Sequence, residues 1–293
     1  MNQYTKEPIP NLAEAVQTVT RLLTHFDTKT FYSEYTPQMV TTNELSHIYN
    51  LKQHIKPGAS VLTVSASGEQ PLFCKLYGAK YVVTFDVSYN SYLLTSVKIA
   101  ALQAFDKNTD YEKFVYDLSH YCKPGQLMDT PKLNYVMPYL TYAQKNHLRY
   151  TDEIGIPVFL GDISCDFYCI PQQQYEILRQ SVKTPFPFIW TNITELDKKL
   201  GNENFDLVYY SNILSFLEPQ KIAPVLESTK KHINPGGSLF LLSEFNEPKP
   251  TIMNTVRDVF ENASDWNIDF KHARKFGDFH DIIIKRCQNS NYR

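Results

Sequence analysis

The sequence predicts an α/β fold organised around a mostly parallel β-sheet, and three observations support it. Short β-branched or aromatic runs begin near residues 61, 81, 187, 206 and 238 and alternate with segments of helical spacing. Such alternation requires parallel strands joined by right-handed crossovers. The last two apolar runs, 268–276 and 279–286, meet at Gly277-Asp278 and predict a closing antiparallel hairpin.

Length and composition set limits on the function. A chain of 293 residues can bury a substantial core in one or two domains. The 29 basic and 31 acidic residues give a formal charge of -2, which argues against nucleic acid as a partner. We expect no stable membrane insertion, because no stretch approaches the roughly 18 apolar residues of a membrane span.

The cysteines and the N-terminus predict a cytoplasmic protein. Five scattered cysteines do not form a disulfide framework, and neither Cys165 with Cys169 nor His120 with Cys122 has the spacing of a zinc site. We therefore expect a reducing compartment and no metal. The first 16 residues lack the basic and apolar regions of a signal peptide.

The stretch 60–86 predicts a nucleotide-binding βαβ unit. A strand over 61–64 leads into the small-residue turn Ser65-Ala66-Ser67-Gly68, a helix from Gln70 and a strand over 81–85 that ends at Asp86. Small residues let a ligand approach the backbone, and an acid at the end of the second strand can accept hydrogen bonds from ribose hydroxyls. The turn has one glycine where dinucleotide sites have three, so S-adenosylmethionine (AdoMet), which has no phosphate, fits better than NAD or FAD. The alternative is an ordinary βαβ unit with a solvated Asp86.

Helical segments flank this unit on both sides. Residues 1–57 are predicted to form a helical cap that contains a helix from Leu12 to Phe26 and an aromatic, hydroxyl-rich segment over 31–36. A helix over 91–105 follows Asp86. Residues 106–185 are too long for a connection and predict an inserted lid or substrate region with helices over 111–121, 135–148 and 175–182.

The α/β pattern resumes at residue 186, so that 58–105 and 186–293 form one predicted domain. Strands over 186–190, 205–210 and 238–242 alternate with helices over 196–200, 219–233 and 251–260, and Asn234-Pro235-Gly236-Gly237 predicts a turn. Ligands of such sheets bind beyond the carboxyl ends of the strands. The residues at these ends are all polar: Ser65, Asp86, Asn192, Ser211, Asn212, Ser243 and Glu244.

Over 58–105 and 186–286 the chain resembles the class I AdoMet-dependent methyltransferase superfamily, with its Rossmann-like fold. The motifs that carry the resemblance are VLTVSASGE, VVTFDVS, FDLVYYSNILSFL and INPGGSLFLL. The chain also resembles, more narrowly, the family of the betaine-lipid 3-amino-3-carboxypropyltransferase. The features shared with that family are the Ser-Gly turn, the segment Thr42-Asn43-Glu44, and a helix with Lys98 and Ala100-Ala101.

The resemblance implies a set of cofactor-binding residues. Ser65, Ala66, Ser67 and Gly68 would border the methionine end of AdoMet, and Asp86 would bind its ribose. Val87 would lie against the adenine, with Asn192 and Ile193 near its amino group. For Asn192 the alternative is a cap of the following turn.

The catalytic candidates are Ser211, Asn212 and Tyr32. Ser211 and Asn212 would face the reacting centre, and Asn212 could instead cap the helical segment that begins at Ile213. His120, His147 and Tyr32 are the candidates for a general base, with a surface position as the alternative for the histidines. Glu69 and Glu244 would contact the AdoMet ammonium or an acceptor amine, or lie in solvent at the ends of their elements.

We therefore expect an AdoMet-dependent transferase that acts on a small-molecule acceptor, with 3-amino-3-carboxypropyl transfer favoured. The alternatives are methyl transfer and a binding module without turnover. A nucleic-acid methyltransferase is less favoured, because the fourth strand ends in Ser-Asn-Ile-Leu rather than in a Pro-Pro-aromatic sequence. The acceptor and the oligomeric state are left open.

Overall fold

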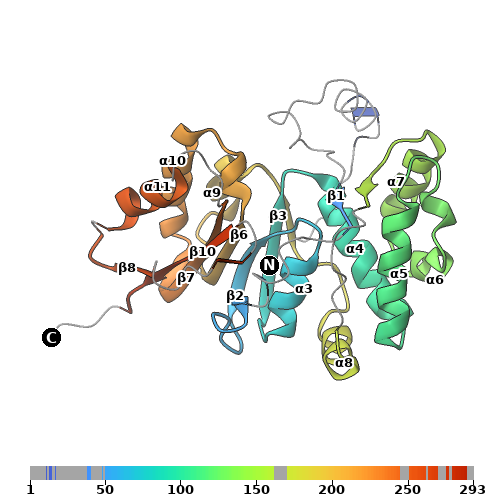
Figure 1. The fold of residues 1–293 in the computed structure, drawn as a ribbon, viewed down its shortest axis with the longest axis horizontal. Helices are drawn as coiled ribbons and strands as arrows, with labels where there is room; N and C mark the ends of the chain where they lie inside the picture. The colour runs from blue at the N-terminus through green and yellow to red at the C-terminus, as the bar shows by residue number, and fades with distance from the viewer. Residues whose placement is uncertain are drawn as a thin grey trace.

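The computed structural model describes residues 11, 13–14, 17, 38–40, 48, 50–161, 170–244, 251–261, 263–269, 275–276 and 279–288 (Figure 1). The predicted helix from Leu12 to Phe26, the 31–36 segment with Tyr32, and Thr42-Asn43-Glu44 lie wholly or largely outside these residues. Cys165 and Cys169 and the side chain of Glu244 lie outside them as well.

The main sheet has the strand order β5-β3-β2-β6-β7-β10-β8, and β9 pairs with β10. Its strands are β2 (Ser60–Val64), β3 (Tyr81–Asp86), β5 (Phe188–Trp190), β6 (Phe205–Ser211), β7 (Ile233–Glu244), β8 (Trp266–Asp269), β9 (Lys275–Phe276) and β10 (Phe279–Arg286). The strands from β5 to β7 pair in parallel, whereas β10 is antiparallel to β7, β8 and β9. The prediction of an α/β fold with a closing antiparallel element is confirmed. A separate short pair joins β1 (Gln38–Met39) to β4 (Phe159–Leu160).

Helices cover both faces of the sheet. Those of the α/β part are α3 (Glu69–Leu76), α4 (Tyr89–Ala104), α9 (Leu196–Leu200), α10 (Pro219–Lys230) and α11 (Thr251–Phe260). Those between residues 106 and 185 are α5 (Asn108–Tyr121), α6 (Leu133–Val136), α7 (Tyr142–Glu153) and α8 (Gln172–Ser181). Short 3-10 helices are η1 (Leu127–Asp129), η2 (Met137–Tyr139), η3 (Ile193–Glu195) and η4 (Ile213–Phe216). In Figure 1, α9 to α11 lie on one side of the sheet and α3 to α8 on the other.

Alternate residues along each strand supply two separate cores, as period-2 strands covered on both faces require. Val61, Val82 and Leu207 belong to the cluster on the α3 and α4 side. Their neighbours Leu62, Val83 and Val208 belong to the cluster beneath α9, α10 and α11. Each face of the sheet is thus buried by helices. A ligand can therefore reach the sheet at the ends of its strands.

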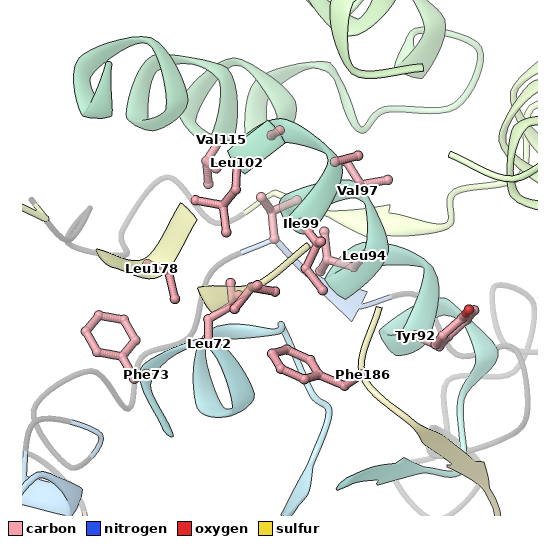
Figure 2. Packing of buried hydrophobic residues seen from close by; sticks show 14 of the residues in the cluster. Leu72, Phe73, Tyr92, Leu94, Val97, Ile99, Leu102, Val115, Leu178 and Phe186 are labelled. Atoms are coloured by element: carbon pink, nitrogen blue, oxygen red, sulfur yellow. The ribbon is translucent and has the colours of Figure 1, made fainter. Parts of the chain in front are cut away.

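The first cluster extends without a break into residues 106–185. Leu72 and Phe73 of α3 share this cluster with Leu102 of α4 and Leu178 of α8, and all four are shown in Figure 2. Leu178 is 1% exposed. The side chains of the insertion therefore complete the core on this face of the sheet. The predicted domain boundaries stay a prediction.

Two predicted elements differ in the structure. The single helix expected over 135–148 is wrong, because the chain forms α6, η2 and α7 there. Pro138 cannot donate a backbone hydrogen bond, and Thr141 starts α7 with a capping box in which it exchanges hydrogen bonds with Gln144.

The turn expected at Asn234-Pro235-Gly236-Gly237 lies inside β7 instead. The pairing with β6 jumps from Phe205 opposite Ile233 to Leu207 opposite Ser238, so these residues form a bulge rather than a chain reversal. Asn234 donates a side-chain hydrogen bond to Asp206 at 2.9 Å. This bond holds the bulge against β6.

In the described part of the chain, the structure has no helix long and apolar enough to cross a membrane and no group of three or more potential metal ligands.

Candidate functional site

The candidate site lies where β2, β3 and β6 end. β2 is flanked by β3 on one side and by β6 on the other, so the chain connections diverge to opposite directions from this strand. A sheet of this kind binds ligands at such a switch point, outside the carboxyl ends of the strands. Thr63 lies opposite Tyr209, which brings Ser65 and Ser211 to the ends of adjacent strands. Asp86 ends the strand on the other side of β2.

The turn after β2 is shaped by two residues with positive φ. Ala66 has a φ of 44° and Gly68 a φ of 93°, and the Gly68 N–H donates to the Ser65 carbonyl at 2.8 Å. A Cβ at Gly68 would lie 3.0 Å from Thr95 Oγ1. The single glycine of the turn is therefore needed for close packing against α4 as well as for its backbone conformation.

The serines of the turn point into the protein. The Ser65 hydroxyl is 3.0 Å from Thr95 Oγ1, and Ser67 donates to the Glu69 carboxylate. Both serines are buried. Ala66 is the half-buried member of the four. Their proposed contact with the methionine end of AdoMet thus depends on backbone groups of the turn more than on the two hydroxyls.

Asp86 is 7% exposed, so the alternative of a solvated acid is wrong. Its carboxylate accepts the backbone N–H groups of Ala66 and Ser88, each at 3.0 Å. Desolvation by burial raises the pKa of Asp86, and hydrogen bonds from Ser88, Ala66, Ser91 and Val87 oppose this shift. These four bonds match the roughly four acceptor positions of a carboxylate, so a ligand hydroxyl would have to share or replace one of them.

A buried ion pair fixes the turn from below. Lys98 of α4 and Glu69 of α3 have fully buried side chains and are paired. Lys98 also donates to the carbonyls of Ser67 at 2.7 Å and Val40 at 2.6 Å. The Lys98 ammonium thereby ties together the turn, the first turn of α3 and the segment that follows β1.

Lys98 and Glu69 were named from the sequence, but their ion pair was not predicted, although the position of Lys98 indicates a buried partner. Lys98 sits on the apolar stripe of its helix, one residue after Val97 and three before Ala101. A lysine at such a position has to find a buried acceptor. Glu69, which was expected near an amine or in solvent, is that acceptor.

Val87, Asn192 and Ile193, which were proposed to contact the adenine, each interact with other residues of the protein. The Val87 carbonyl accepts the Trp190 ring N–H at 2.9 Å. Asn192 is exposed, and its side chain accepts the Thr194 N–H at 3.0 Å, so it is the cap that the alternative predicted. Ile193 is 4% exposed and belongs to the cluster beneath α9 to α11.

Ser211 and Asn212 form the end of β6. Ser211 is buried and has a φ of 55°, and a β-bulge separates its pairing from that of Tyr209. Asn212 is half-buried and its side chain does not cap η4; its carbonyl accepts the Ser215 N–H at 2.9 Å. Asn212 is therefore the N-cap residue of η4, as the alternative predicted, but its side chain makes no capping hydrogen bond. A strained residue at a strand end is a recurrent feature of functional sites.

His147 of α7 is buried beside the start of α4, so the alternative of a surface position is wrong for it. Its side chain is 1% exposed, its Nε2 is 3.2 Å from Asn90 Oδ1, and its ring centroid is 5.1 Å from that of Tyr89. Desolvation lowers the pKa of His147 to about 4, so the ring is neutral at pH 7. Its Nδ1 is buried and finds no partner among the described residues. His120 instead bonds the Tyr116 carbonyl of its own helix at 2.8 Å.

No family model and no curated protein matches the chain. Among solved structures, the ribosomal protein L11 methylase from Lactobacillus delbrueckii subsp. bulgaricus is 13% identical, with a TM-score of 0.43 over 85% of this chain and 81% of that one. An rRNA methylase from Streptococcus thermophilus is 10% identical, with a TM-score of 0.41 over 85% and 99%.

A third solved structure is the magnesium protoporphyrin IX methyltransferase from Synechocystis PCC 6803 with bound SAM. It is 11% identical, with a TM-score of 0.39 over 97% of this chain and 87% of that one. The names of these three proteins refer to different compounds: a ribosomal protein, an rRNA and a magnesium porphyrin. At these identities and TM-scores, the ligand and the reaction of this chain have to be argued from its own residues.

Proposed function

We propose that this protein is an AdoMet-dependent transferase that acts on a small-molecule acceptor, with AdoMet bound at the carboxyl edge of β2, β3 and β6. The observation that carries the proposal is Asp86. It is a buried acid with a raised pKa at the end of the strand next to the switch point of the sheet. Perturbed acids in such positions are candidates for functional sites, and ribose hydroxyls are suitable donors that would share or replace one of its present hydrogen bonds.

The turn that leads into α3 favours AdoMet over a dinucleotide. Free N–H groups at a helix N-terminus attract phosphate, but here the first residue of α3 is Glu69. Its carboxylate is fully buried and lies beside the Ser67 hydroxyl and the Lys98 ammonium. The charge of this carboxylate is balanced by the Lys98 ammonium, so the preference for AdoMet depends on the single glycine of the turn, where dinucleotide sites have three.

AdoMet supplies an electrophilic carbon on a sulfonium sulfur. The residues of this chain would hold the ligand and exclude water, which is the main requirement of such a displacement. Asp86 would fix the ribose, and the backbone of the turn around Ala66 would border the methionine arm. Ser211 and Asn212 at the end of β6 would face the reacting carbon, with Tyr32 as a further candidate.

The proposal covers two reactions, which differ in the carbon that is attacked. Transfer of the 3-amino-3-carboxypropyl group is favoured by the narrower sequence resemblance, and methyl transfer is the alternative. The formal charge of -2 favours a small-molecule acceptor over RNA.

The test has a binding arm and a turnover arm. Calorimetry with AdoMet, S-adenosylhomocysteine and NADH should show binding of the two adenosyl ligands only. Incubation with AdoMet and a small-molecule cell extract, followed by mass spectrometry, should yield 5′-methylthioadenosine for aminocarboxypropyl transfer or S-adenosylhomocysteine for methyl transfer. A parallel incubation with total RNA tests the acceptor class.

Each outcome has a definite meaning. Absence of adenosyl binding, or preferential binding of NADH, would overturn the proposal. Binding without either by-product would make the protein a binding module. Product formation that requires the RNA fraction would overturn the small-molecule acceptor alone.

A further inference from the structure

A pocket lies in the insertion, away from the strand ends. It is a pocket of about 380 Å³ lined by Met128, Leu133, Asn134, Met137, Pro138, Lys145 and Arg149. These residues come from η1, α6, η2 and α7, which lie at the end of the molecule opposite α10 and α11 (Figure 1). The volume is within the range of small-molecule sites, roughly 300–1,000 Å³.

The wall contributed by η1, α6 and η2 is mainly apolar. Met128, Leu133 and Met137 are buried or half-buried, and Pro138 lies at the surface. Methionine side chains adapt to the shape of an apolar ligand because they are unbranched and polarizable. This half of the pocket suits a short hydrocarbon chain.

The wall contributed by α7 is cationic. Lys145 is half-buried and Arg149 is exposed one turn further along the same helix. Among the described residues neither cation has a carboxylate within 4.0 Å. From residue 130 to residue 151 the sequence contains no Asp or Glu.

The nearest acid along α7 is already occupied. Asp152 accepts the backbone N–H groups of Leu127 at 2.7 Å and Met128 at 3.3 Å, and these bonds hold η1 against α7. Lys132, the other basic residue of the segment, is paired with Asp110. Among the described residues, Lys145 and Arg149 therefore line the pocket with no carboxylate within ion-pair distance.

From this arrangement we propose that the pocket binds a small molecule that carries one carboxylate or phosphate on a short apolar chain. Arg149 offers the planar fork that matches either anion, and Lys145 adds a point charge beside it. The methionine wall takes the chain. This site is separate from the proposed AdoMet site and does not depend on it.

The experiment is calorimetric titration of the full chain with four probes. Decanoate and decyl phosphate carry the anion and the chain, decanol carries only the chain, and inorganic phosphate carries only the anion. All are used below the concentrations at which they aggregate. We expect decanoate or decyl phosphate to bind at least about tenfold more tightly than decanol or phosphate, since one charge-assisted hydrogen bond contributes about 1.5–3 kcal/mol. The two anionic probes distinguish a carboxylate from a phosphate ligand.

The variant K145Q/R149Q should weaken binding of the anionic probe by at least about tenfold, with an unchanged thermal unfolding temperature. The matched control is K198Q/K221Q, which removes two exposed lysines from other parts of the chain and should alter affinity less than about twofold. Hydrogen exchange should show protection by the probe in α7. No binding of either anionic probe, equal binding of decanol, or unchanged affinity of K145Q/R149Q would each overturn the proposal.

Discussion

At the scale of single residues, Asp86 combines two roles. It accepts two backbone N–H groups that hold the β2 turn and the start of α4, and in the proposed function it also accepts from the ribose of AdoMet. Burial raises its pKa, so the folded state favours the neutral acid and its stabilising contribution is lost as pH rises through the folded pKa. Ionised Asp86 is therefore less favourable in the folded state than a solvated carboxylate would be.

Asp86→Asn should weaken both folding and binding, to different extents. The amide keeps one acceptor oxygen, but its NH2 group would face one of the two backbone N–H donors of Ala66 and Ser88, so we expect the free energy of unfolding to fall by about 1–3 kcal/mol. The affinity for AdoMet should fall about 10- to 100-fold, because charge-assisted hydrogen bonds contribute about 1.5–3 kcal/mol. Calorimetry and urea unfolding measure the two quantities. Asp129→Asn, at an exposed acid of η1, is the control; a D86N protein with wild-type affinity would refute the site assignment.

A comparison of alanine substitutions at Gly68 and Gly58 can separate the cost of a packing clash from the cost of backbone strain. Both have left-handed φ values, 93° and 85°, but a Cβ at Gly58 meets nothing within 4 Å, whereas one at Gly68 would press on Thr95. Gly58→Ala should cost about 1 kcal/mol of strain, and Gly68→Ala should cost more, up to about 3 kcal/mol. Thermal and urea unfolding of the two variants measure the difference. Equal losses would mean that the turn does not need its close approach to α4.

At the scale of elements, α4 is the helix on which the site is assembled. Its first turn holds Asn90 against His147 of α7, and its middle holds Lys98 against Glu69 and the β2 turn. Removal of either Lys98 or Glu69 would leave the other charge buried without a partner, which typically lowers the free energy of unfolding by about 3–5 kcal/mol. The insertion and the turn are therefore positioned by the same helix.

His147 should make the docking of α7 on α4 sensitive to acid. Its folded pKa of about 4 is below the ordinary value of 6.5, so its contribution is complete above pH 6.5 and is lost as pH falls toward 4. The loss should approach about 3 kcal/mol. Urea unfolding at several pH values, compared with His147→Gln, measures it. The difference in stability between wild type and H147Q should shrink over this range; a constant difference would show that the ring is solvated.

Local sequence patterns predicted those strands in which nearly every residue has the same buried, apolar environment. The strands at Val61, Val82 and Val208 were predictable because both faces of the sheet are apolar. The burial of His147 was not, because α7 is polar on most of its surface and the histidine is buried by a helix 57 residues away in the chain. The Lys98–Glu69 pair joins residues 29 positions apart, so spacing alone could not reveal it.

The same distinction applies to the candidate site. Asp86, Ser65 and Ser211 were predictable because a parallel sheet brings its carboxyl ends to one edge. The direction of Ser65 was not predictable, because its neighbour Thr95 belongs to α4, whereas the cap that Asn192 forms with Thr194 is local and was one of the alternatives. The pocket of the insertion depends on the break at residues 140–141 that separates α6 and η2 from α7, and the prediction of one continuous helix did not include this break.

At the scale of the whole molecule, the question is whether residues 106–185 fold as a separate lid. The core on one face of the sheet contains Leu72 and Phe73 of α3 together with Leu178 of α8, so the insertion and the α/β part should unfold together (Figure 2). Leu178→Ala should reduce the free energy of unfolding by about 2–5 kcal/mol. Ile177→Ala, at the adjacent position that is 50% exposed, should change it by less than about 0.5 kcal/mol.

The two tryptophans make this test specific to the sheet. Trp190 lies in β5 and Trp266 in β8, so their fluorescence reports unfolding of the α/β part, whereas circular dichroism reports all helices. If the core is shared, Leu178→Ala should lower the urea midpoint equally by both signals, because a single cooperative transition connects them. If the insertion is an independent lid, the tryptophan midpoint should stay at its wild-type value while circular dichroism shows an earlier transition. A midpoint shift seen by both signals would place the insertion within the folding unit that carries Asp86.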